Sequence, residues 1–487
     1  MKNCKYFYVD AHAGAGKTYA AHDFITSNSD RHFVIATQTN ALSNQQCIDL
    51  RKLGRDAHVI SRENAITNCT KRFIRHCKES AHIIPLVHQS VALQELDGTE
   101  EHHLIVDEYP SPVQKIVLKE DLASGQRALS SILCTARKTE CDGYVELTSN
   151  SYVKEISDDS AKSVSMFKES KNLRKVCRYI ESPHWRVIVH EKEFNGLASF
   201  QDSQRSGEGK YFSLTVYVLM QPSVLANYAS VTFMGANFTR SKLYLAWRSI
   251  VDFEPHPEIK KFRYKDFSHK EGKIKVVYLS EAPVSMKRLK DIGYESVIAS
   301  IAGEVEAAYP SRPYIYTIYA GASDSVWPGA NGTRLSANPM GLNDYLHYNM
   351  AVHAATLNPS NDHFAVWKAF YGVTREELMA AQAYEMQYQF ATRTSIRDGK
   401  LASESEEVVL IVLDRRSADA LCEVLSVDEP SFKLEVTAFS EYQAPPRKAR
   451  SDKKPPKSRE QVRAAAAERQ RICRARKRGI VPDALHA

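Results

Sequence analysis

The chain has 487 residues, of which 43% are hydrophobic and 25% charged, and this composition excludes a largely disordered protein. No apolar run approaches the roughly 18 residues of a membrane span, and the first residues lack the apolar segment and cleavage site of a secretory signal peptide. The net charge of +7 is unevenly spread: residues 447–487 carry 14 basic and 4 acidic side chains, which leaves the remainder at −3.

The first part of the chain alternates strand-like and helix-like segments. Continuous apolar strands, rather than alternating ones, indicate a parallel sheet that is covered on both faces. The expected elements are a strand over Lys5–Val9, a helix from Lys17, a strand over His32–Ala36, a helix over Ala41–Leu53, and strands over Ile83–Val87 and Leu104–Val106. We predict a first α/β domain over residues 1–250.

The segment 115–209 interrupts this pattern. It is polar and rich in Ser and Lys, and we expect an insertion that is helical in parts. Its basic stretch, from Lys168 to Arg178, is interpreted as a solvated helix face. Whether the insertion contacts nucleic acid or is only a structural elaboration stays open. Strand character returns over Tyr211–Val218 and Ser230–Met234.

A second α/β domain is predicted over residues 251–440. Its clearest strands are Lys273–Leu279, Tyr314–Tyr319 and Glu407–Leu413, followed by a helix over Arg416–Leu425. Residues 441–487 are too polar to form a core, so we expect a disordered basic tail that favours polyanions such as nucleic acid. The nine cysteines form no CxxC pair, which fits a reducing compartment and predicts a cytoplasmic protein.

The sharpest motif is the run from Ala11 to Thr18, AHAGAGKT, which matches a phosphate loop with Ala in place of the first Gly. Small residues let backbone N–H groups turn toward a phosphate, and the following helix adds its positive N-terminal end. Lys17 can reach the β- and γ-phosphates, and the Thr18 hydroxyl can bind Mg²⁺. We therefore predict an ATP and Mg²⁺ site in which the cofactor-binding residues are Ala13, Gly14, Ala15, Gly16, Lys17 and Thr18.

An acidic pair follows the strand LIV. Asp107 and Glu108 resemble a Walker B motif, in which the first carboxylate holds Mg²⁺ and the second polarises the attacking water. The metal ligands are thus predicted to be Thr18 and Asp107. Together the two motifs predict a nucleotide-hydrolysing core.

Further segments resemble those of a superfamily 2 helicase of the DEAD/DEAH-like kind, in the expected order, and their style is similar to that of helicase-like proteins of phages and plasmids. Motif Ia would be residues 36–42, motif III residues 233–237, motif V residues 336–343 and motif VI residues 389–397. Motif III lacks the usual Ser-Ala-Thr, which leaves its coupling role open. The resemblance implies two RecA-like P-loop NTPase domains within an α/β fold, with nucleic acid crossing both.

The last of these segments implies catalytic residues supplied by the second domain. Gln389, Arg393 and Arg397 would complete a catalytic set with Glu108 of the first domain, with an arginine finger neutralising the γ-phosphate. The two arginines are four residues apart rather than three, so either can be the finger.

The resemblance implies an ATP-dependent helicase or translocase acting on single-stranded DNA or RNA, with no membrane partner. Two alternatives stay open: a remodeller that moves on duplex without separating strands, and a nucleic-acid-binding protein whose ATPase is only a switch.

Overall fold

The computed structural model describes residues 4–63, 68–80, 82–94, 96–120, 129–158, 171–204, 212–337, 344–397 and 407–442. The predicted disorder of the basic tail concerns residues that lie almost entirely outside these ranges, as do residues 338–343 of the segment compared with motif V. Among the described helices, none combines the length and the apolar character needed to cross a bilayer.

The first sheet has seven strands, and all its pairings are parallel. Their order is β12 (Phe253–Pro255), β1 (Lys5–Asp10), β11 (Ser230–Gly235), β5 (His102–Asp107), β2 (His32–Thr37), β4 (Ile84–His88) and β3 (Ala57–Ile60). Because the strands are parallel, the carboxyl ends of β1 and β5 lie at the same edge, separated only by β11. The phosphate loop and the acidic pair follow these two ends.

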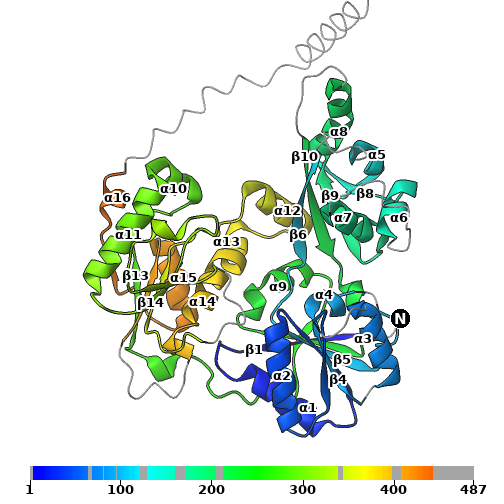
Figure 1. The fold of residues 1–487 in the computed structure, drawn as a ribbon, viewed down its shortest axis with the longest axis horizontal. Coiled ribbons are helices and arrows are strands. Elements are labelled where there is room, and N and C mark those ends of the chain that lie inside the picture. Colours follow the sequence, from blue (N-terminus) through cyan, green and yellow to red (C-terminus); the bar gives the residue numbers. More distant parts are fainter. Residues whose placement is uncertain are drawn as a thin grey trace, which may run out of the picture. The chain divides into compact units, whose positions relative to one another are not determined.

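Helices cover both faces of this sheet, since its strands are apolar on both sides (Figure 1). Alternate residues along β2 show this: Ile35 packs with the helices of one face, and Val34 with those of the other. The first face carries α1 (Lys17–Ser27) and α2 (Asn40–Lys52), and the second carries α3 (Cys69–Glu79), α4 (Gln89–Ala92) and α9 (Lys242–Trp247).

Between β5 and β11 the chain leaves the sheet and builds a second, antiparallel one. Its strand order is β6 (Val113–Glu120), β10 (Phe212–Met220), β9 (Trp185–His190), β8 (Tyr144–Leu147) and β7 (Ala136–Lys138). Its helices are α5 (Leu129–Ile132), α6 (Ser151–Ser157), α7 (Lys171–Glu181) and α8 (Glu191–Gln204). The sequence predicted helices here and the strand β10, but it missed the other strands, because the apolar runs of strands such as β6 and β9 are only three residues long and lie between polar residues.

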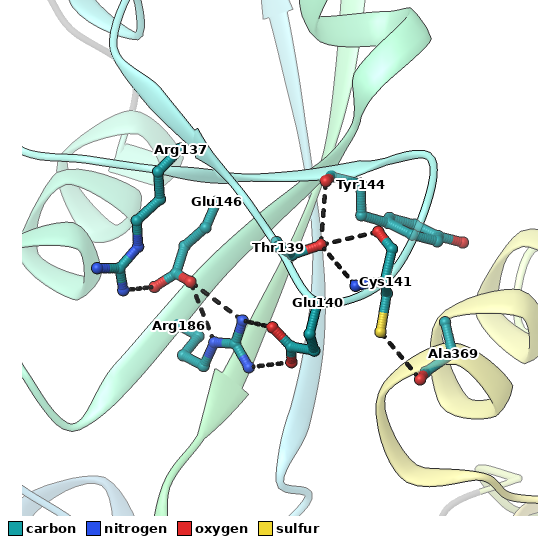
Figure 2. A network of polar contacts seen from close by, with 8 residues as sticks. All are labelled: Arg137, Thr139, Glu140, Cys141, Tyr144, Glu146, Arg186 and Ala369. Carbon is teal, nitrogen blue, oxygen red and sulfur yellow. Dashed lines mark hydrogen bonds and ion pairs between the residues drawn. The ribbon is translucent and has the colours of Figure 1, made fainter.

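Arg186 on β9 forms ion pairs with two glutamates from neighbouring segments of this sheet (Figure 2). Its guanidinium pairs with both carboxylate oxygens of Glu140, at 2.6 and 2.8 Å, and with Glu146, at 3.1 Å. The Cys141 thiol beside this network donates to the carbonyl oxygen of Ala369, at 3.0 Å, which lies on α12 (Asn361–Tyr371). The antiparallel sheet therefore contacts a helix from much later in the chain.

The third sheet has six parallel strands. Their order is β15 (Gly332–Arg334), β14 (Tyr314–Thr317), β16 (Met350–His353), β17 (Val408–Val412), β13 (Ile274–Tyr278) and β18 (Phe432–Lys433). One face packs on α11 (Tyr294–Ala308), with α10 (Met286–Ile292) and α16 (Thr437–Ser440) beside it, and the other on α14 (Glu385–Ala391) and α15 (Arg415–Leu425). The helix α13 (Arg375–Met379) and a π-helical turn (Ala380–Tyr384) lead into α14.

The predicted fold class, α/β with two RecA-like domains built on parallel sheets, is confirmed. Its cores are shared between segments that are distant in sequence. Val366 and Trp367 of α12 belong to the same apolar cluster as Trp247 of α9, and Ala13 of the phosphate loop belongs to the cluster of Tyr388 on α14. The second parallel unit is thus packed against the first.

Candidate functional site

The phosphate loop turns sharply between β1 and α1. Gly14 and Gly16 have φ of 82° and 89°, a left-handed conformation that side chains with a Cβ atom disfavour. Gly16 is the N-cap residue, so the first free N–H groups of α1 point into the loop. A Cβ atom on Gly14 would overlap the carbonyl oxygen of Arg397 and the hydroxyl of Tyr264. Small residues are therefore required here both by the turn and by close neighbours.

Lys17 begins α1 and folds back over the loop. Its ammonium donates hydrogen bonds to the carbonyl oxygens of Ala11, at 2.6 Å, and His12, at 3.1 Å. Burial lowers the pKa of Lys17, while the carboxylates of Glu108 and Asp107 oppose this shift. Thr18 lies in the same first helical turn and is partly exposed. The cation thus lies beside both predicted acidic residues.

Asp107 ends β5 and is almost completely buried, with 7% of its surface exposed. The Gln46 amide donates to its Oδ2 atom at 2.5 Å. Burial, followed by the nearby charge of Glu108, raises the pKa of Asp107 to about 6. A nearby dication stabilises the ionised form of a buried carboxylate, which burial otherwise disfavours. Mg²⁺ is commonly bound by one or two carboxylates together with the phosphates of a nucleotide. The donor set of Asp107 and Thr18 therefore fits the predicted metal.

Glu108 adopts a strained backbone conformation, with φ of 72°. Such strain in a residue other than Gly persists only where the surroundings enforce it, and it is common at active sites. Its amide donates to the carbonyl oxygen of Met234 at 2.9 Å, and the Gln89 amide donates to the carbonyl oxygens of both Asp107, at 3.0 Å, and Glu108, at 2.8 Å. These bonds hold the acidic pair in one orientation.

Arg393 lies two residues after the end of α14, and Arg397 ends the 3₁₀ turn that follows (Ser395–Arg397). Arg393 is 4% exposed, and burial, followed by the charge of Arg397, lowers its pKa to about 10, while Glu108 opposes the shift. Arg397 lies against Gly14, and its charge also acts on Lys17 and Asp107. Both arginines are therefore brought to the phosphate loop and the acidic pair.

Gln389 contacts Arg393 and connects it to Glu385. Its amide donates to Glu385 Oε1 at 2.8 Å, and its Oε1 atom accepts from Arg393 at 3.5 Å. The other Glu385 oxygen accepts from the Asn237 amide at 3.0 Å. Burial raises the pKa of Glu385 to about 7. A chain of polar contacts thus runs from Asn237, just after β11, through Glu385 and Gln389 to Arg393.

Sequence reasoning missed several residues of this site. The Tyr388 hydroxyl accepts a hydrogen bond from the Ala13 amide at 2.8 Å, and the Tyr264 hydroxyl donates to the Ala13 carbonyl oxygen at 2.5 Å. Gln46 and Glu385 were likewise not singled out. Tyr388 and Glu385 could have been found by their spacing, since each lies one residue or one turn from Gln389 on the same helix.

No family model and no curated protein matches the chain. Solved structures to which it is similar include S. tokodaii Xpd4, at 12% identity and a TM-score of 0.44, over 88% of this chain and 95% of that one. S. cerevisiae Dbp5 bound to RNA and ADP BeF3 gives 9% identity and a TM-score of 0.36, over 90% and 87%. Mss116p bound to ssRNA and AMP-PNP gives 9% and 0.33, over 91% and 72%. These three proteins are superfamily 2 helicases.

Proposed function

We propose that this chain hydrolyses ATP and couples the hydrolysis to movement along, or unwinding of, DNA or RNA. The observation that carries the proposal is the contact between the phosphate loop and the segment of α14 and its following turn. Ala13 and Tyr388 are 375 residues apart in sequence and share a hydrogen bond. A nucleotide bound on one segment would therefore meet cations from the other.

The phosphates of ATP would lie over the loop, where the N–H groups from Gly14 to Thr18 and the Lys17 ammonium can bind them. In the structure, the Lys17 ammonium donates hydrogen bonds to two carbonyl oxygens of the loop. We expect it to exchange these for phosphate oxygens. Thr18 and Asp107 would hold Mg²⁺, which neutralises charge on the phosphate oxygens when bound.

Glu108 would orient and polarise the attacking water. Its backbone is held by hydrogen bonds to Met234 and Gln89. This matters because enzymes catalyse phosphoryl transfer mainly by positioning the reacting groups, rather than by covalent chemistry of their own. Arg393 and Arg397 would stabilise the charge that develops on the γ-phosphate. Loss of that phosphate would remove the anion that both segments share. Hydrolysis would then loosen their contact, and this change would drive movement.

The decisive experiment measures ATP turnover alone and with single-stranded DNA, single-stranded RNA and duplex. We expect single strands to stimulate turnover. Lys17→Ala should abolish turnover at an unchanged unfolding temperature, whereas Lys52→Ala, an exposed lysine at the end of α2, should behave as the native chain. Native turnover in Lys17→Ala would refute the site. A strand-displacement assay then separates unwinding from movement on duplex, and absence of any stimulation would favour the switch.

A further inference from the structure

A groove of about 1080 Å³ opens between the antiparallel sheet and the first parallel sheet. One wall is α7, and the opposite wall is formed by residues 88–94, which follow β4, together with Arg62. Trp185 and Met220, from β9 and β10, also line it. The groove is separate from the phosphate loop, none of whose residues line it.

The wall formed by α7 is cationic. Lys171, Arg174, Lys175 and Arg178 all line the groove and follow the spacing i, i+3, i+4, i+7, which places them on one face of a helix. The opposite face of α7, with Leu173, Val176 and Cys177, is buried in the core of the antiparallel sheet. This packing fixes the direction in which the basic face points. Lys171, Lys175 and Arg178 are exposed, as the sequence interpretation of a solvated face expects, and the same face lines the groove.

The charge of the groove is one-sided. Among the described residues that line it, five are Lys or Arg and none is Asp or Glu. Like charges at positions i and i+4 of a helix repel each other. Lys171 and Lys175 form one such pair, and Arg174 and Arg178 form another. A ligand carrying regularly spaced negative charges would relieve this repulsion along the whole face. A phosphodiester backbone has this property.

Aromatic rings accompany the cations. Tyr179 and Trp185 both line the groove and are partly exposed, with ring centroids 4.6 Å apart. The Lys175 ammonium lies 5.7 Å from the Tyr179 ring centroid. Ring faces next to a basic track are how proteins bind single strands without sequence preference, because bases of a duplex are stacked on each other and cannot reach them.

The groove also reaches the acidic pair through Gln89. This side chain lines the groove, and its amide donates to the carbonyl oxygens of Asp107 and Glu108. Pro110 and Ser111, which follow the acidic pair in sequence, line the groove as well. An occupant would therefore touch the residues that orient Glu108.

We propose that this groove binds a single strand of nucleic acid, with its phosphates along the basic face of α7 and its bases toward Tyr179 and Trp185. The inference deepens the proposed function and rests on it for the identity of the ligand. It assigns a binding role to the antiparallel sheet, which then is more than an elaboration of the first domain.

The test uses the full chain and measures binding of labelled oligothymidylate and oligouridylate by fluorescence anisotropy at several salt concentrations. The variant Lys171→Ala/Lys175→Ala removes two groove cations. The matched control Lys154→Ala/Lys192→Ala removes two exposed lysines of the same part of the chain that do not line the groove. The basic tail is present in every protein, so it contributes equally to each comparison.

We expect the groove variant to bind both strands more weakly and its slope of log affinity against log salt to fall by about 0.7 for each lysine removed. The control should keep the native affinity and slope. Equal binding by the groove variant and the native chain, or an equal loss in the control, would overturn the inference. ATP turnover by Lys17→Ala is measured separately: if it stays native, the proposed function fails, whereas the groove result concerns binding alone.

Discussion

The Ala13 amide donates a 2.8 Å hydrogen bond to the Tyr388 hydroxyl, and this bond joins the phosphate loop to α14. Tyr388 is buried, so an amide that lost this acceptor would have no water to replace it. The same Ala13 residue accepts from Tyr264 through its carbonyl oxygen. Two tyrosines from the second half of the chain therefore hold one peptide of the loop.

Tyr388→Phe should lower the free energy of unfolding by about 1 kcal/mol, because it leaves the Ala13 amide unsatisfied at almost unchanged volume. Tyr217→Phe is the matched control. The Tyr217 hydroxyl is buried and has no hydrogen-bond partner among the described residues, so its removal should be neutral or stabilising. Thermal unfolding of both variants measures the difference. Equal unfolding temperatures would show that the bond to Ala13 contributes nothing.

Glu385 should make stability depend on pH. Burial raises its pKa from 4.5 to about 7, so the folded chain binds a proton that the unfolded chain releases between these values. Stability is therefore lost as pH rises through this window. Glu385→Gln cannot ionise, and we expect its unfolding temperature to rise relative to the native chain between pH of about 5 and about 8. Exposed Glu429→Gln is the control, and a constant difference between Glu385→Gln and the native chain would contradict the prediction.

The local parts of this site could be predicted from the sequence, and the long-range parts could not. The run from Ala11 to Thr18 determines its own turn and helix start, and the strand over Val408–Val412 was predicted to within a residue at each end because five consecutive apolar residues specify a buried strand. Asn237 ends the segment compared with motif III, but its bond to Glu385 arises through tertiary packing alone and could not be predicted. Of the antiparallel sheet, the sequence predicted β10, whereas β6 and β9 were missed because their apolar runs are only three residues long and lie between polar residues.

Arg393→Ala and Arg397→Ala should both still bind ATP, and at least one should lose turnover by about a thousandfold, the effect of removing an arginine finger. Arg393 is the more deeply buried of the two. The variant Arg393→Lys is therefore included, because it keeps the positive charge at this position but loses the planar guanidinium group. Arg415→Ala, which removes a surface ion pair with Asp419, is the control. Nucleotide binding and single-turnover hydrolysis are measured for each. Native turnover in both alanine variants would remove the arginines from the mechanism.

Arg186→Ala should destabilise the antiparallel sheet by about 2 kcal/mol. The substitution removes an ion-pair partner of the nearly buried Glu146 carboxylate, and it also removes both hydrogen bonds to Glu140 (Figure 2). Arg137 contacts the same Glu146 but is 67% exposed, so Arg137→Ala should cost less than about 1 kcal/mol. Chemical denaturation of the two variants checks the order. If Arg137→Ala cost as much, the network would not depend on Arg186.

Gln89→Ala should uncouple nucleic acid from hydrolysis. The substitution removes the hydrogen bonds to the Asp107 and Glu108 carbonyl oxygens, at 3.0 and 2.8 Å, and so frees a strained backbone that these bonds help to hold. We expect the stimulation of turnover by single strands to fall about tenfold, since positioning errors of this kind act on turnover, while the affinity for the oligonucleotide stays near native. Gln94→Ala, an exposed glutamine in the same groove, controls for the loss of an amide there. A weaker affinity with unchanged stimulation would instead make Gln89 a simple ligand contact. Because the two readouts move in opposite ways under the two roles, the experiment distinguishes a residue that binds the strand from one that transmits its presence to Glu108.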